Sequence, residues 1–166
     1  PEVLDDLALH DETGDKIPSE LMDKYLQCQK FNQGFATTEY LASSSLDLAW
    51  HTSDKDITEI DHFEKDLFNS IEKPQEIDSR YGSTYFNHIF SGGYSSSYYS
   101  YMWSEVLDSS AFEVFEKNGI YDKESGQKLK EFVYASGNSK DLMEQFVKFN
   151  GKEPDPKRLL EKRGLA

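Results

Sequence analysis

One histidine and four tyrosines surround a Gly-Gly pair in the segment from His88 to Tyr101. A phenol has an ordinary pKa near 10, so at neutral pH it keeps its proton and can donate a hydrogen bond. Such a donor can stabilise an oxyanion that develops in a transition state, and its removal typically costs roughly 3 kcal/mol. A histidine can donate to the same oxyanion or to a substrate carbonyl. The residue types therefore suggest half of an active site, one that stabilises negative charge on oxygen.

Tyr94, Tyr98 and Tyr101 are spaced so that a helix would place all three on one face. Tyr94 could instead lie in the loop just before that helix. The alternative to a functional face is an aromatic core stripe, because aromatic side chains dominate protein cores. Two features favour function. Gly92-Gly93 permits backbone shapes that a core helix does not need, and His88 precedes on the far side of the same turn.

The nucleophile, base or metal site that would complete this half is not found in the 166 residues. The four histidines never stand three or four residues apart, which is the spacing that a two-histidine zinc helix requires; they are His10, His51, His62 and His88. The Gly-x-Ser-x-Gly pattern of a nucleophilic serine is also missing. A single cysteine excludes an internal disulfide, and we expect Cys28 to be a half-buried, unreactive thiol.

The formal net charge of −13 repels phosphate backbones, so nucleic acid is not an expected partner. The acidic residues are scattered over helical positions, as is typical of a solvated surface. The sequence contains no run of about 18 apolar residues, so it predicts no membrane span. We interpret Pro1 as a point inside a longer protein, so the compartment of that soluble protein, cytoplasmic or periplasmic, stays open.

Apolar residues recur at helical spacing along most of the chain, and alternating strand patterns are nearly absent. The predicted fold is therefore all-α or mostly α, in a single domain over residues 1–166. Thr37 or Thr38 is a candidate cap for the third helix. The predicted helices cover residues 1–10, 20–30, 37–51, 53–71, 79–90, 97–117, 123–135, 140–149 and 156–162.

The segment from Phe86 to Glu105 resembles the C-terminal signature of the thimet oligopeptidase, oligopeptidase A and peptidyl-dipeptidase family of zinc metallopeptidases. The similarity covers essentially the whole chain. Further matches in the family's order are Pro1-Glu-Val-Leu, His10-Asp-Glu-Thr-Gly14, Phe31-Asn-Gln-Gly-Phe35, Leu46-Asp47 with Trp50-His51, Gly151-Lys-Glu-Pro154 and Arg163-Gly-Leu165. Two segments are closer to the bacterial peptidyl-dipeptidase branch: Ser136-Gly-Asn-Ser139 and the run from Arg80 to Phe86.

The resemblance implies a helical, zincin-type catalytic domain divided by a deep channel. Its zinc is held by a His-Glu-x-x-His helix and a further Glu, both of which would lie upstream of Pro1. This chain would be the C-terminal portion of that domain and one wall of the channel. Alone it would bind no catalytic zinc and be inactive. The implied partners are oligopeptide substrates and the upstream part of the same domain, with no nucleic acid and no membrane.

The same resemblance implies roles for individual residues. Tyr94 and Tyr101 match tyrosines that hydrogen-bond the tetrahedral intermediate. His88 matches a substrate-contacting histidine, and Tyr98 matches an aromatic residue that lines the channel.

Gly92 and Gly93 match a flexible loop that brings the tyrosines in as the cleft closes. Ser97 stands where relatives often have glycine. The implied activity is the release of dipeptides from the C-termini of oligopeptides. The alternatives are an oligopeptidase that cuts inside short peptides and, in another class, a non-enzymatic helical module that binds peptides.

Overall fold

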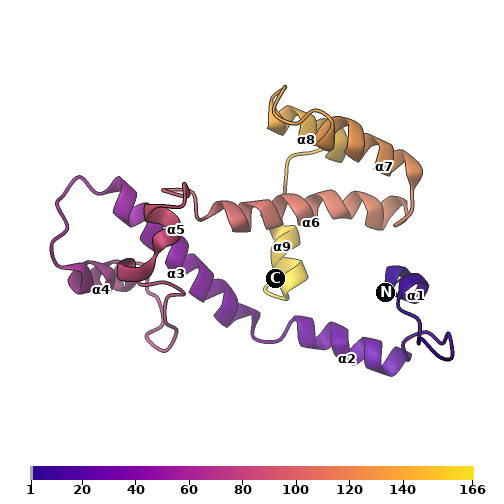
Figure 1. The fold of residues 1–166 in the computed structure, drawn as a ribbon, viewed down its shortest axis with the longest axis horizontal. Helices are drawn as coiled ribbons and strands as arrows, with labels where there is room; N and C mark the ends of the chain where they lie inside the picture. Colours follow the sequence, from indigo (N-terminus) through magenta and orange to yellow (C-terminus); the bar gives the residue numbers. More distant parts are fainter. Residues whose placement is uncertain (1) are drawn as a thin grey trace. The chain divides into compact units, whose positions relative to one another are not determined.

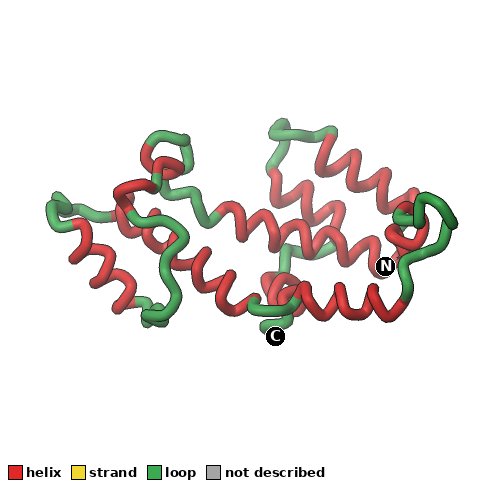
Figure 2. Tube along the Cα trace, turned by 60° about the horizontal axis from the view of Figure 1, so that its bottom comes forward, coloured by secondary structure: helices red, strands yellow, loops and turns green. Residues whose placement is uncertain are grey.

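The computed structural model describes residues 2–166, and Pro1, the first residue of the predicted helix 1–10, lies outside them. Their regular structure is helical apart from one isolated bridge between Leu9 and Lys16 (Figure 2). The predicted all-α fold class is confirmed. The helices are α1 (Glu2–Leu7), α2 (Ser19–Gln29), α3 (Gln33–Thr52), α4 (Ile60–Ser70), η1 (Ser83–Tyr85), α5 (Asn87–Phe90), α6 (Ser100–Asn118), α7 (Lys123–Leu129), η2 (Lys130–Tyr134), α8 (Leu142–Asn150) and α9 (Pro156–Arg163).

The chain divides into two compact units, each of which is described by itself. Unit 1 combines residues 2–31 with Glu105–Ala166, and unit 2 is Asn32–Ser104. Unit 2 therefore holds every residue that the sequence suggests for a site.

The core of unit 2 lies between the buried face of α3 and the segment that runs from η1 to the start of α6 (Figure 1). Four side chains form its centre, and each is less than 5% exposed: Leu46, Phe86, Ile89 and Tyr98. Burying a large apolar side chain contributes roughly 1.5–3 kcal/mol. This cluster therefore holds the His- and Tyr-bearing segment against α3.

The predicted helix 37–51 begins earlier than expected. α3 starts at Gln33, and its N-cap residue Asn32 has a φ of +57°. Asparagine tolerates this left-handed conformation better than most residues, so the chain turns at Asn32 and the helix starts directly after it. Thr37 and Thr38 lie inside the helix, and the prediction that either caps it was wrong.

The predicted helix 79–90 is not continuous, because tertiary hydrogen bonds engage its middle. Ser83 Oγ accepts a hydrogen bond from the indole N–H of Trp50 at 2.6 Å. The backbone N–H of Ser83 donates to Glu64 Oε1 at 2.5 Å. A backbone donor that is taken by a distant carboxylate is not available for a helical bond. Only the 3₁₀ turn η1 and the four-residue helix α5 form here.

Two other predicted helices begin later than expected, at Ile60 instead of residue 53 and at Ser100 instead of residue 97. In the first case Ser53 Oγ accepts a hydrogen bond from the backbone N–H of Lys55, a local contact that competes with helix formation. The predicted helix 123–135 is α7 followed by the π-helical segment η2.

In unit 1, aspartate side chains cap the N-termini of three helices. Asp122, Asp141 and Asp155 each accept a backbone N–H from the first turn of α7, α8 and α9, respectively. The backbone N–H of Asp155 also donates to Ser110 Oγ on α6, at 3.0 Å. Cys28 on α2 is exposed, so the expectation of a half-buried thiol was wrong.

Candidate active site

The segment 94–98, here called the tyrosine turn, leads into α6. The N–H of Ser97 donates to the carbonyl of Tyr94 at 2.9 Å, and Ser96 has a φ of +56°. A left-handed residue in such a turn is usually glycine. Because α6 begins only at Ser100, Tyr94 and Tyr98 precede it, and the prediction of one helical face carrying all three tyrosines was wrong. Tyr94 follows the alternative, a place in the loop.

The turn nevertheless brings Tyr94 and Tyr101 together. Their rings stack with centroids 5.5 Å apart and planes 11° apart. His88 joins them: its ring centroid lies 4.8 Å from that of Tyr94, and its Nε2 lies 2.9 Å from the hydroxyl oxygen of Tyr101. Tyr94 is 37% exposed and Tyr101 is 39% exposed. We call these three side chains the donor cluster, because each carries an N–H or O–H group. Two of them, Tyr94 and Tyr101, are exposed to solvent.

The electrostatics of the donor cluster favour the neutral form of the Tyr101 phenol. A hydrogen bond with Tyr94 raises the pKa of Tyr101 above its ordinary value of 10, and partial burial adds to the effect. A phenol with a raised pKa keeps its proton over the whole neutral range and beyond. Tyr101 is therefore suited to donate a hydrogen bond and unsuited to act as a base near pH 7.

Tyr98 lies in the core and not on the surface. It is 4% exposed, and its ring stacks on Tyr40 and meets Phe86 edge-on, with centroids 5.3 and 5.0 Å away. Burial raises the pKa of Tyr98 to about 12. In unit 2 this side chain has almost no surface to offer a substrate. The structure thus places Tyr98 beneath Tyr101, with centroids 5.4 Å apart, where it supports the donor cluster.

Each residue of the Gly92-Gly93 pair has its own geometric requirement. A Cβ at position 92 would lie 2.8 Å from the backbone oxygen of His88, a distance that real Cβ atoms do not tolerate. Gly93 has a φ of +78°, which side chains disfavour. Both glycines are therefore required to let the chain turn tightly after α5, independently of any motion of the loop.

Two residues of α3 that sequence reasoning did not select also reach the tyrosine turn. Asp47 accepts the backbone N–H groups of Ser96 and Tyr98, and Tyr40 donates its hydroxyl to the carbonyl of Tyr98. The sequence signal that could have found them is their seven-residue spacing, which places two polar groups on one helix face. His51 lies one turn beyond Asp47, with its Nδ1 2.9 Å from Asp47 Oδ1.

Between residues 2 and 166, no three His, Cys, Asp or Glu side chains are grouped so that they could hold a metal ion. The described residues therefore offer no zinc site of their own, and the ligands that the resemblance implies would come from outside this chain. Among the helices that the structure describes, none is long and apolar enough to span a membrane.

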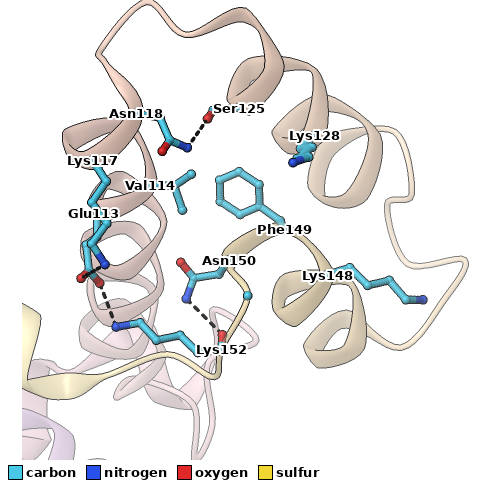
Figure 3. A pocket seen from close by; sticks show the side chains of 11 residues that line it. Glu113, Val114, Lys117, Asn118, Ser125, Lys128, Lys148, Phe149, Asn150 and Lys152 are labelled. Carbon is cyan, nitrogen blue, oxygen red and sulfur yellow. Dashed lines mark hydrogen bonds and ion pairs between the residues drawn. The ribbon is translucent and has the colours of Figure 1, made fainter.

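Unit 1 contains a pocket of about 330 Å³ that is lined by parts of α6, α7 and α8 (Figure 3). Four lysines line it, which is notable in a chain of net charge −13: Lys117, Lys128, Lys148 and Lys152. Lys117 and Lys152 pair with Glu113 at 2.7 and 3.0 Å, and Lys148 extends away from the pocket in Figure 3.

The ends of two helices explain why lysines gather around this pocket. α6 ends at Asn118 and α8 ends at Asn150, and both residues line the pocket. The C-terminal end of a helix carries partial negative charge, which nearby lysines stabilise. We therefore attribute the lysines to helix capping and ion pairing, and the donor cluster remains the candidate active site.

An all-helical chain that presents two stacked, exposed tyrosines beside a histidine has the residues expected of an enzyme that stabilises an oxyanion. Comparison with known proteins gives the class: the chain matches peptidase family M3 over residues 1–165 and belongs to that family. The resemblance that the sequence motifs indicated is confirmed.

Relatives of both kinds suggested by the sequence are found. The chain is 33% identical to the dipeptidyl carboxypeptidase of Escherichia coli, over 99% of the chain and 25% of that protein. It is 33% identical to oligopeptidase A of the same organism, over 99% of the chain and 25% of that protein. It is 36% identical to an organellar oligopeptidase A of Arabidopsis thaliana, over 96% of the chain and 21% of that protein. The chain thus spans about a quarter of the length of these relatives.

Proposed function

We propose that this chain supplies the oxyanion-binding and substrate-contacting side chains of a zinc-dependent peptidase that releases dipeptides from the C-termini of oligopeptides. The observation that carries the proposal is the convergence of Tyr94, Tyr101 and His88 into one partly exposed cluster of hydrogen-bond donors. Membership of peptidase family M3 supplies the reaction class.

Hydrolysis of a peptide bond passes through a tetrahedral intermediate in which the former carbonyl oxygen carries negative charge. Preorganised donors directed at that oxygen stabilise it more than they stabilise the substrate. In this proposal the hydroxyls of Tyr94 and Tyr101 donate to the oxygen. The raised pKa of Tyr101 ensures that the proton is present when the charge develops.

His88 sets the direction of the Tyr101 hydroxyl in this arrangement. Its Nε2 and the Tyr101 oxygen are 2.9 Å apart, and either could be the donor. If Nε2–H donates to the tyrosine oxygen, the phenolic hydrogen is directed away from His88, toward Tyr94 or the substrate oxygen. We propose this direction of the hydrogen bond for the active form, with His88 also available to contact the substrate.

The zinc ion and the residues that hold it would come from outside this chain, as would the residues that form the rest of the substrate site. The partners we propose are therefore an oligopeptide and the remainder of the same catalytic domain. An oligopeptidase that cuts inside short peptides is the second candidate, because relatives named oligopeptidase A are as similar to the chain as the dipeptidyl carboxypeptidases.

The first test uses Tyr94→Phe and Tyr101→Phe in the full polypeptide that contains this chain. Each substitution removes one hydroxyl and keeps the ring, so we expect kcat to fall by about two to three orders of magnitude with a smaller change in KM. Tyr99→Phe is the matched control: it is the same substitution in the same segment, at a 50% exposed side chain outside the donor cluster. Full activity in both test variants would contradict the proposal and would favour a module that only binds peptides.

The second test separates the two kinds of peptidase. Equal rates on oligopeptides that end in a free carboxylate or in an amide would identify an oligopeptidase. Loss of dipeptide release upon amidation is the result expected for a peptidyl-dipeptidase, because such an enzyme must recognise the C-terminal carboxylate.

A further inference from the structure

The backbone of the tyrosine turn is held by the side chains of two α3 residues, Tyr40 and Asp47. Asp47 is fully buried. A buried carboxylate is costly unless its oxygens are hydrogen-bonded. Here Oδ1 accepts the N–H of Ser96 at 2.9 Å and Oδ2 accepts the N–H of Tyr98 at 2.8 Å. Both carboxylate oxygens thus bind the turn.

Tyr40 holds the same turn at another point. Its hydroxyl donates to the carbonyl oxygen of Tyr98 at 2.5 Å, and its ring stacks on the Tyr98 ring. The backbone of Tyr98 is therefore held at its N–H by Asp47 and at its C=O by Tyr40. The same carbonyl faces the backbone N–H of Tyr101 at 3.5 Å, in the first turn of α6. A shift at Tyr98 would therefore move Tyr101.

The conformation of the turn needs this support. Ser96 has a φ of +56°, and a non-glycine residue in that region persists only where its surroundings impose it. The hydrogen bond from the Ser96 N–H to Asp47 provides such a constraint. On the other side, Ser95 Oγ donates to the carbonyl of Ile89 at 2.6 Å, which links the turn to α5 and so to His88.

His51 also contacts the carboxylate of Asp47. Its Nδ1 lies 2.9 Å from Asp47 Oδ1 and 2.8 Å from the Asp47 carbonyl oxygen. Both of these partners are acceptors, so Nδ1 carries the proton. The side chain of His51 is 22% exposed, and the ring meets Phe90 of α5 at a centroid distance of 5.8 Å. The buried carboxylate is therefore fully satisfied by groups of α3 and of the turn.

We propose that Asp47 and Tyr40 are positioning residues: they hold the backbone of the tyrosine turn so that Tyr94 and Tyr101 stack with their hydroxyls placed for the oxyanion. This inference rests on the proposed function of the two tyrosines. Neither residue touches the substrate. Both act through the backbone of Tyr98. The role of this buried tyrosine is therefore to transmit their hold to Tyr101.

The test is a double-mutant cycle in the full polypeptide that contains this chain, with an oligopeptide substrate. Asp47→Asn replaces one carboxylate oxygen by an NH₂ group, which then faces the backbone N–H of Ser96 or Tyr98. Tyr40→Phe removes the hydroxyl that donates to the Tyr98 carbonyl. A 1 Å misplacement of a catalytic group can cost about 100-fold in rate, so we expect the loss of a positioning contact to cost about 10–100-fold. We expect Asp47→Asn to lower kcat within that range and Tyr40→Phe to lower it by about three- to tenfold, with KM changed less than kcat.

The readout that separates positioning from general destabilisation is the coupling to Tyr101. In a Tyr101→Phe background the donor that a shift at Tyr98 would move is already lost and only Tyr94 still donates, so we expect each α3 substitution to cost less than about threefold more. Ser43→Ala is the control: Ser43 is fully buried on the same helix but bonds Ser79 Oγ and the Glu39 carbonyl, not the turn. It should leave kcat unchanged in both backgrounds.

The possible outcomes are distinct. Equal losses with and without the Tyr101 hydroxyl, or losses no greater than for Ser43→Ala, would overturn the positioning role while leaving the proposed function intact. Full activity of Tyr101→Phe alone would instead refute the proposed function. If Asp47→Asn does not fold, as judged by circular dichroism and size-exclusion chromatography, Tyr40→Phe decides alone, because it keeps the stacked ring.

Discussion

At the scale of the residue, the donor cluster depends on how sharply the chain turns after His88. His88 and Tyr101 are 13 residues apart in the chain, yet Nε2 of one lies 2.9 Å from the hydroxyl of the other. Gly92 makes this return possible, because only a hydrogen stands where a Cβ would press on the His88 carbonyl. The contact between His88 and Tyr101 thus depends on glycine at position 92.

This geometry predicts the effect of Gly92→Ala. The added methyl group would lie 2.8 Å from the His88 oxygen, so α5 or the turn has to shift. A small displacement of a preorganised group is costly for catalysis, and we expect kcat to fall by about tenfold or more. Steady-state kinetics of the full polypeptide would measure it.

Gly34→Ala is the matched control, since a Cβ there meets no atom within 4 Å. That variant should be fully active and somewhat more stable, because alanine favours a helix over glycine by about 1 kcal/mol. A Gly92→Ala variant as active as the control would contradict the inference that the tight turn requires glycine at position 92.

Residue types alone selected the three side chains that the structure brings together in the donor cluster, because phenols and an imidazole are hydrogen-bond donors. They could not place Tyr98, whose spacing from Tyr94 suggests a shared surface only if both lie in one helix. They also missed Asp47 and Tyr40. The contacts of these residues span 51 and 58 positions and depend on how α3 packs against the turn.

At the scale of the element, helix ends were predicted well where local chemistry decides them and poorly where tertiary contacts do. α8 and α9 lie within two residues of their predicted ranges, and left-handed glycines, Gly151 and Gly164, follow them. The predicted helix 79–90 failed because Trp50 and Glu64 bind Ser83 from outside the segment. Such partners cannot be inferred from periodicity.

One ion-pair group links α6 to the segment that follows α8, and it predicts a pH dependence of stability. Hydrogen bonds from Lys117 and then Lys152 lower the pKa of Glu113 from 4.5 to about 2. A lowered folded-state pKa means that ionised Glu113 stabilises the fold above about pH 4.5 and that this contribution is lost as the pH falls toward 2.

Glu113→Gln should therefore lower the free energy of unfolding by about 1 kcal/mol at pH 7, a value that allows for solvent screening. The difference from the unmodified protein should shrink as the pH falls from 4.5 to 2. Urea unfolding at several pH values would measure both. Glu124→Gln removes a more exposed pair, with Lys128, and should change the free energy of unfolding less than Glu113→Gln does, because solvent screens exposed pairs. Equal effects of the two substitutions at every pH would contradict the special role of Glu113.

At the scale of the whole molecule, the donor cluster is one part of a site that we propose to be completed by another part of the same protein. The relatives are about four times as long as this chain. Large apolar side chains are well exposed in the described residues, among them Leu7 at 77% and Phe31 at 81%. Exposed apolar surface of this kind commonly marks an interface. We propose that the remainder of the catalytic domain covers it.

This division of the site predicts that activity can be reconstituted from two pieces. The 166-residue chain alone should show no peptidase activity and, after dialysis, no stoichiometric zinc, because a protein zinc site takes three or four ligands and the described residues group none that fit. Elemental analysis and a peptide assay would test both statements, with Cys28→Ser excluding weak binding at the exposed thiol.

Adding a separately produced upstream piece should restore zinc-dependent peptide hydrolysis, and a chelator should abolish it. A chain that carries Tyr101→Phe should bind the upstream piece equally well but restore about two to three orders of magnitude less activity. This variant separates assembly from catalysis, because the hydroxyl is on the donor cluster while the phenyl ring keeps its packing. Zinc-dependent activity of the upstream piece alone, at the rate of the mixture, would show that the donor cluster is not part of the catalytic site.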